Sequence, residues 1–184
     1  REMKKNLVAL LLVLAVVSFG VFAATSQTFD LQTVITGVTE LKLKSESVSD
    51  VPGYNNGTNN FTDSTVTVQP SEVGSAKQIA YIATKSNNRT GITLSVTAEA
   101  MSSSFPGGVT KYINYTIDVG GQQETTDGAN NAVIDNVFGA ASSGFTGVSV
   151  LSSQITITVD ADEYAAAATG TYIGTVTFNV QANG

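Results

Sequence analysis

Apolar and polar residues alternate along most of the chain after residue 27, and Thr, Val, Ile and Tyr dominate the alternating segments. A period of two places successive side chains on opposite faces of a strand, and β-branched and aromatic residues suit a half-buried pleated surface. The pattern therefore predicts strands in residues 28–35, 39–45, 64–69, 77–84, 91–100, 111–119, 153–160 and 170–184.

The same alternation predicts which side chains share one face of each strand. They are Phe29, Leu31 and Ile35; Leu41 and Leu43, opposite Lys42 and Lys44; Val66 and Val68; Ile79, Tyr81 and Ala83; Ile92, Leu94, Val96 and Ala98; Ile113, Tyr115, Ile117 and Val119; Ile155, Ile157 and Val159; Tyr172, Val176, Phe178 and Val180. The last strand is expected to pair with Gln154–Asp160. Gly174 on its inward face predicts a bulge or a close neighbour.

Segments rich in Gly, Asn and Pro separate the alternating runs, as expected of turns. About eight short strands with such turns predict an all-β fold, a single antiparallel sandwich or barrel spanning residues 24–184. Helical structure is expected only as a short helix in 130–140 and a helical turn in 162–170.

The first residues read REMKKNLVALLLVLAVVSFGVFAATS. Two lysines precede an apolar run, and Val21 and Ala23 stand at −3 and −1 of a cleavage point after Ala23. This layout is typical of a secretory signal peptide over residues 1–23. The alternative is a membrane anchor, because Leu7–Ala24 is near the lower limit for spanning a bilayer. We expect the signal peptide, since Ser18 and Gly20 interrupt the apolar run.

The composition excludes several kinds of chemistry. The chain has no Cys and no His, so a Ser-His-Asp or Cys-His arrangement, a disulfide and the usual zinc and copper ligands are all absent. Its formal net charge of −6 argues against binding nucleic acid, which requires Lys and Arg to neutralise phosphates. We expect no enzyme activity and no cofactor, and contact with a membrane only through the signal peptide.

Two groups of residues remain as candidates for binding. Asp160, Asp162 and Glu163 are a weak candidate for calcium, because carboxylate oxygens suit that ion, but a solvated loop explains them as well. Nothing in the spacing selects a pair of carboxylates for hydrolysis. Tyr112 and Tyr115 fall on opposite faces of one strand, so at most one of them is expected in the core. An exposed tyrosine ring favours the binding of sugars or protein partners.

The C-terminal part resembles a known group of domains. It reads ITITVDADEYAAAATGTYIGTVTFNVQA, and Gly170, Thr171, Tyr172, Thr175 and Thr177 match the closing strand of spore-coat-protein-U-like and fimbrial, pilin-type domains. YINYTI (112–117) looks like an earlier strand of these domains, and TSQTFDLQTVITGV (25–38) like their first strand. The chain departs from them in lacking a cysteine pair and in a long stretch over 120–150. The resemblance implies an exported immunoglobulin-like sandwich in a surface fibre or coat, which some relatives assemble by donating a strand.

These observations favour an exported structural or adhesive surface protein of a bacterium, in the periplasm, on the cell surface or in an extracellular fibre. Self-association or binding to other surface proteins is expected, and the assembly strand would carry Phe29, Leu31 and Ile35. The alternative is a secreted or periplasmic carbohydrate-binding module without catalytic activity, whose partners would be glycans. A hydrolase that uses two carboxylates is the third reading.

Overall fold

A computed structural model describes residues 32–33, 35–63 and 65–184, and residues Thr36–Gly184 form one compact unit. This unit is mostly β-strand in antiparallel sheets, which confirms the all-β prediction. Its strands are β1 (Thr39–Lys44), β2 (Lys77–Ser86), β3 (Ile92–Ala98), β4 (Met101–Phe105), β5 (Val109–Ile113), β6 (Tyr115–Val119), β7 (Gln122–Thr125), β8 (Ala132–Ile134), β9 (Ser149–Val159) and β10 (Val176–Ala182). The helices are α2 (Val51–Asn55), α3 (Ala161–Ala166) and the 3-10 turns η1 (Gly57–Asn59), η2 (Pro70–Glu72) and η3 (Gly139–Ser142).

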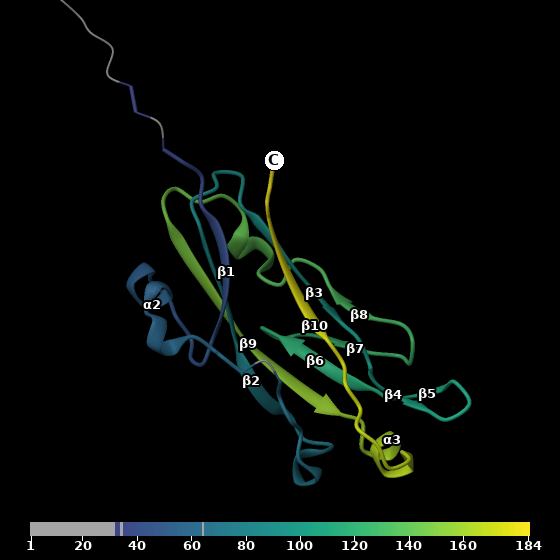
Figure 1. The fold of residues 1–184 in the computed structure, drawn as a ribbon. Coiled ribbons are helices and arrows are strands. Elements are labelled where there is room, and N and C mark those ends of the chain that lie inside the picture. The colour runs from purple at the N-terminus through teal and green to yellow at the C-terminus, as the bar shows by residue number, and fades with distance from the viewer. Residues whose placement is uncertain (1–31, 34, 64) are drawn as a thin grey trace, which may run out of the picture. The chain divides into compact units, whose positions relative to one another are not determined.

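The strands form three sheets. A five-stranded sheet has the order β1-β2-β9-β6-β7, a three-stranded sheet the order β10-β3-β8, and β4 and β5 make a hairpin. Figure 1 shows α2 beside β2 and β9, and α3 next to the β4–β5 hairpin near the start of β10. Both helices begin at an aspartate, because Asp50 and Asp160 accept a hydrogen bond from a backbone N–H three residues on.

The main core lies between the two larger sheets and takes side chains from both. Ile82, Ile117 and Ile155 come from the five-stranded sheet, and Leu94 and Val96 come from β3. The predicted inward faces of 91–100 and 111–119 are confirmed, since all eight of their residues are buried. The segment 111–119 nevertheless forms two strands, β5 and β6, separated at Asn114.

The predicted face of β2 is confirmed for Ile79, which packs against the main core, and is wrong in phase for Tyr81 and Ala83. The register between β2 and β9 shifts between Gln78 and Ala80, so that Ala80 and Ile82 face the main core. Ala83 instead joins a second cluster with Val48 and Tyr54. A bulge adds one residue to a strand and reverses the alternation that follows, which the sequence pattern does not reveal.

The predicted pairing of the closing strand is also wrong. β10 pairs with β3, in antiparallel register from Val176 opposite Ala98 to Ala182 opposite Ile92. β9 is already paired on both sides, with β2 and β6, and therefore offers no edge to β10. The connection through α3 carries the chain from one sheet to the other. α3 itself confirms the helical turn predicted in 162–170.

Two further segments differ from expectation. Residues 65–69 of the predicted strand 64–69 pair with no strand, although Val68 packs against the core. A β-favouring composition alone makes no ladder without a neighbouring strand. The segment 130–140 contains β8 and the start of η3 instead of an α-helix. Asn136 and Gly139 have φ of 54° and 53°, which breaks a regular helix there.

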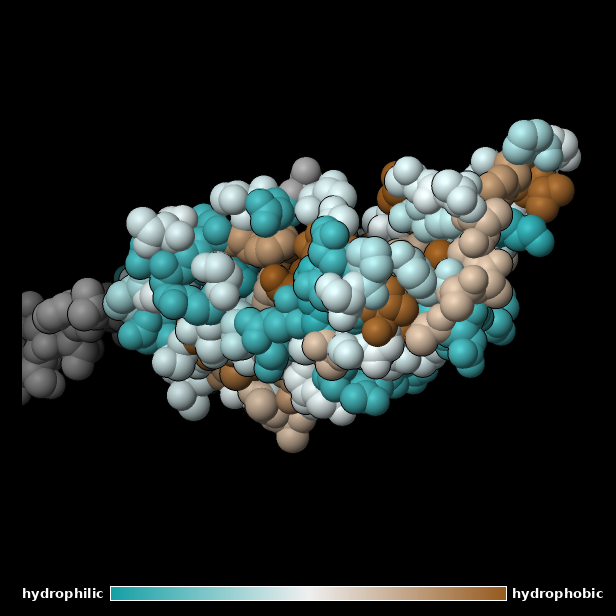
Figure 2. Space-filling model, turned by 90° about the horizontal axis from the view of Figure 1, so that it is seen from below, coloured by the Kyte–Doolittle hydropathy of each residue, from teal (hydrophilic) through white to brown (hydrophobic). Residues whose placement is uncertain are grey.

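Figure 2 shows hydrophobic residues as separate areas among hydrophilic ones on the face that it presents. Phe145, in the loop after η3, is 8% exposed, so it is a buried residue and not a surface contact.

Candidate assembly edge and neighbouring polar clusters

β10 has a strand partner on one side only. It is the outermost strand of its sheet, and no strand among the described residues pairs with its other side, which we call the open edge. Backbone bonds to Ile173 and Thr175 come from Ser102 and Glu99, and the N–H of Asn183 donates to Gly91. All three positions are odd-numbered. Since residues in an antiparallel strand turn their main-chain groups to alternate sides, the even-numbered residues of β10 direct theirs to the open edge.

The even-numbered residues are also the ones that face the core. Val176, Phe178 and Val180 pack against the main core but remain half-buried. The corresponding residues of the neighbouring strand β3, such as Leu94 and Val96, are at most 1% exposed. Among the described residues, one row of core side chains is therefore incompletely covered, and the backbone groups beside it have no strand partner.

Both ends of β10 are fixed. At its start, a Cβ on Gly174 would come within 2.6 Å of the backbone oxygen of Glu99, so only glycine fits. This confirms the predicted close neighbour, which is backbone. At its end, Asn183 accepts hydrogen bonds from the side chains of Asn88, Thr90 and Thr93. The open edge is thus held in an extended form without a strand along it.

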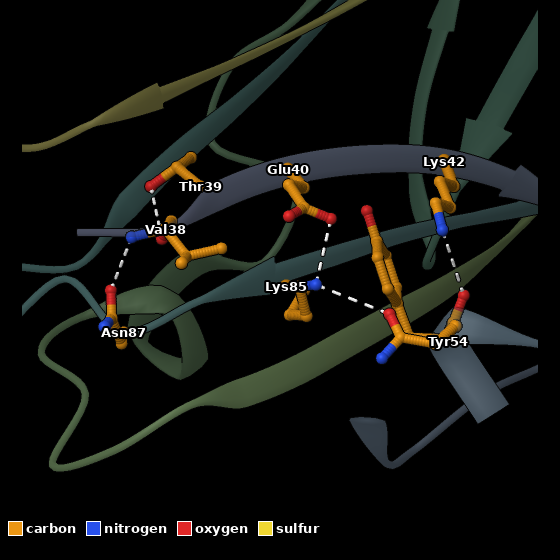
Figure 3. Close-up of polar contacts among 8 residues, drawn as sticks. Val38, Thr39, Glu40, Lys42, Tyr54, Lys85 and Asn87 are labelled. Carbon is orange, nitrogen blue, oxygen red and sulfur yellow. Dashed lines mark hydrogen bonds and ion pairs between the residues drawn. The ribbon is translucent and has the colours of Figure 1, made fainter. Parts of the chain in front are cut away.

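β1, the edge strand of the other sheet, lies near β10 and differs from it in chemistry. Lys42 and Lys44 of β1, together with Lys85 of β2, surround Tyr54 of α2 and form what we call the lysine–tyrosine cluster. Their ammonium nitrogens lie 4.6, 5.7 and 5.1 Å from the ring centroid, within the range of cation–π attraction. Glu40 pairs with Lys85 at 3.0 Å, as Figure 3 shows.

Burial shifts the pKa values of two residues of this cluster, Tyr54 and Lys44. Tyr54 is 0% exposed, and burial, with a smaller contribution from the charge of Glu40, raises its pKa to about 12. Its hydroxyl has no hydrogen-bond partner in the described structure. Lys44 is also 0% exposed, and burial together with the charge of Lys42 lowers its pKa, against an opposing effect of Glu46.

Two of the three residues singled out as a calcium candidate, Asp160 and Glu163, make hydrogen bonds within the fold. The carboxylate of Asp160 caps α3, and that of Glu163 accepts bonds of 2.6 and 2.8 Å from the backbone and side chain of Asn114. Asp162 lies in the first turn of α3. Within the part of the chain that the structure describes, no three His, Cys, Asp or Glu side chains gather into a group that could hold a metal ion.

The predicted assembly strand lies largely outside the described residues. Phe29 and Leu31 are outside them, and Ile35 is 80% exposed and not part of a strand. Its role as an assembly strand stays a prediction.

A small pocket of about 230 Å³ lies between β5, α3 and the residues before β10. Tyr112 and Tyr172 line it together with Lys111 and Glu163. Tyr112 on β5 is 39% exposed and Tyr115 on β6 is 4% exposed, which confirms that at most one of the two rings is in the core, although they stand on two strands and not on opposite faces of one. The hydroxyl of Tyr172 donates to the backbone of Ala168 at 3.2 Å.

Sequence reasoning missed the open edge and the buried Lys44. One signal for the edge was present, because residues 172–184 contain no charged side chain, whereas natural edge strands usually carry one. Lys44 had no such signal. A lysine on the polar face of an alternating strand is normally exposed, and only the fold of residues 45–60 covers it.

The chain matches no protein-family model, and no curated protein matches it. In residues 32–33, 35–63 and 65–184, no helix has the length and hydropathy needed to cross a membrane.

Proposed function

We propose that this chain is a non-catalytic subunit of an exported surface structure, and that copies join by adding a strand to the open edge of β10. The observation that carries the proposal is that edge itself. An added strand would satisfy the free main-chain groups of Val176, Phe178 and Val180 and cover their half-buried side chains at the same time.

The proposed donor is residues 24–36 of another copy. Phe29, Leu31 and Ile35 share one face of an extended segment, which suits an apolar row, and the segment contains a single charge, Asp30. In this proposal residues 1–23 are a signal peptide, and the packed sheets are an immunoglobulin-like sandwich that lacks one strand. The resemblance to fimbrial and spore-coat-like domains supports the same reading.

Self-assembly of the chain beginning at Ala24 tests the proposal. We expect higher oligomers or filaments by analytical ultracentrifugation and electron microscopy. Leu31→Asp should disable the donor, while Gln32→Asp adds the same charge on the opposite face and should not. Val180→Lys should disable the acceptor, while Asn179→Lys adds its charge on the outer face and should not.

Mixing the two disabled variants separates a lost contact from misfolding. The Leu31→Asp chain keeps its acceptor edge and the Val180→Lys chain keeps its donor, so the mixture should form a one-to-one dimer and nothing larger. A wild-type chain that stays monomeric at high concentration, with residues 24–36 protected from exchange along its own β10, would show a self-complete domain and refute the proposal.

A second candidate function is carbohydrate binding at the pocket beside α3. The exposed ring of Tyr112 next to Tyr172 favours it, because sugars stack on tyrosine faces. Saturation-transfer NMR with a glycan library tests it. Tyr112→Ala should abolish any signal, whereas Tyr164→Ala removes an equally exposed ring that does not line the pocket. Absence of signal for the wild-type chain would remove this candidate.

A further inference from the structure

Lys44, the last residue of β1, is held by neutral oxygens alone. Its ammonium nitrogen lies 2.8 Å from Asn60 Oδ1, 2.8 Å from the backbone oxygen of Asn56 and 3.4 Å from that of Gly53. The ion pairs in the described part of the chain are Lys77–Glu72 and Lys85–Glu40, so no carboxylate pairs with Lys44 there. Burying an ammonium group without a counter-ion is costly.

The free-energy cost of burying the Lys44 ammonium group favours its neutral amine form. A neutral lysine amine is a nucleophile. Burial and the neighbouring charge of Lys42 both act in this direction, since they lower the pKa of Lys44. A buried amine of this kind needs an electrophile in contact with it to react, and the side-chain amide of Asn60 is the group it contacts.

The backbone holds the two side chains opposite each other. Lys44 and Asn60 form an antiparallel bridge, flanked by bonds from Phe61 N to Leu43 O at 3.0 Å and from Ser45 N to Asn59 O at 2.9 Å. Because a C=O bond is about 1.23 Å long, the Cγ of Asn60 lies at most about 4 Å from Nζ. Reacting atoms in near-attack geometries lie about 3–3.5 Å apart, so a small adjustment suffices.

We propose that Lys44 and Asn60 become joined by an intramolecular isopeptide bond. The ammonium group of Lys44 first gives up one proton, and the lone pair of Nζ then attacks Cγ of Asn60. A further proton passes from Nζ to Nδ2, the Cγ–Nδ2 bond breaks, and Nδ2 leaves as ammonia. The product is a secondary amide between Nζ and Cγ. The reaction is an acyl transfer without oxidation or reduction, and it needs no external reactant.

The carboxylate of Glu46 is the base that can receive the first proton. Its charge acts on Lys44, and its carboxylate accepts a hydrogen bond from the side chain of Asn59, the neighbour of Asn60. The bond would close the loop that contains α2 and η1 and fix the end of β1 to it. This inference does not depend on assembly at β10.

Mass spectrometry of the purified full chain tests the proposal directly. The intact mass should be lower than the sequence mass by one ammonia, also after denaturation. Proteolytic mapping should then find the peptide with Lys44 linked to the peptide with Asn60. Mapping is essential because a succinimide at Asn56–Gly57 or at Asn183–Gly184 would lose the same ammonia.

Variants assign the reaction to the two residues. Lys44→Met and Asn60→Ser should restore the full mass. The controls Lys111→Met and Asn179→Ser change exposed residues that do not contact Lys44 or Asn60, and they should keep the crosslink. A wild-type chain in which mapping finds Lys44 and Asn60 unlinked overturns the proposal, and this result stands whether or not any variant folds.

Discussion

β1 and β10 are the edge strands of two different sheets and lie near each other. They differ in the charge of their side chains and in whether another segment bonds to the outer edge. β1 carries Glu40, Lys42 and Lys44, and residues 59–61 fold back to bond with its outer side at Leu43 and with Ser45, the residue that follows the strand. β10 carries no charge, and no segment of the described chain bonds to its outer side.

The difference shows where the fold allows another strand to pair. Charges and covering segments protect an edge from pairing, and a neutral alternating strand without cover invites it. The protection of β1 is built by a loop, because Tyr54 and α2 cover its lysines. The exposure of β10 comes from the sequence of the strand itself.

The largest effect is expected where the cover of β1 is removed. Tyr54→Ala deletes a wholly buried ring around which three ammonium groups gather. We expect it to lower the free energy of unfolding by about 3 kcal/mol or more, as measured by denaturant titration.

Tyr164→Ala is the matched control, because that ring is 39% exposed in α3. It should change the free energy of unfolding by less than about 0.5 kcal/mol. Equal losses in the two variants would mean that Tyr54 does not anchor the cover of β1.

A valine-to-alanine pair compares β3 with β10 directly. Val96 is 1% exposed on β3, and Val180 is half-buried on β10. Val96→Ala should lower the free energy of unfolding by about 2 kcal/mol. Val180→Ala should lower it by roughly half of that, because the methyl groups of Val180 are already partly in water. Denaturant unfolding of the monomer gives both values. If Val180→Ala costs as much as Val96→Ala, the open edge is covered in solution.

The alternation predicted the strands from residue 77 onward well wherever a strand is regular and one face is buried. β3 and β6 show this, since their inward residues could be named in advance. The alternation failed where the face or the pairing of a strand depends on other parts of the chain. The bulge in β2 reverses the faces of Tyr81 and Ala83, and the pairing of β10 with β3 depends on which strand has a free edge.

The candidate site was predictable only in part. The neutral alternating sequence of β10 was visible, but its role as an edge was not, because strand order does not follow from one strand's pattern. Lys44 shows the same limit. Its burial is caused by Gly53, Asn56 and Asn60, which come from a segment that has the composition of an ordinary turn.

A smaller effect is expected from the hydroxyl of Tyr54. Its pKa is raised from 10.0 to about 12, so between these pH values the unfolded chain binds fewer protons than the folded one. Stability therefore falls as the pH rises through this window. Tyr115, whose pKa burial also raises to about 12, contributes in the same direction.

Tyr54→Phe should remove one of these contributions and flatten the fall in melting temperature between pH 10 and 12. At neutral pH it should be neutral or stabilising by up to about 1 kcal/mol, because it deletes a buried hydroxyl that has no partner. The Tyr54→Phe/Tyr115→Phe double variant should flatten the fall further. An unchanged alkaline slope in Tyr54→Phe would show that this hydroxyl is solvated.

The smallest effect involves no change in stability and addresses the open edge most directly. In amide hydrogen exchange followed by NMR on the Leu31→Asp chain, Thr177 and Asn179 should be protected, because their N–H groups face β3. Phe178 and Val180 should exchange much faster, since theirs face the open edge. Adding a synthetic peptide of residues 24–36 should protect Phe178 and Val180 while leaving Leu41 of β1 unchanged. If the peptide protects Leu41 instead, the strand adds to β1, and the charged edge is the acceptor.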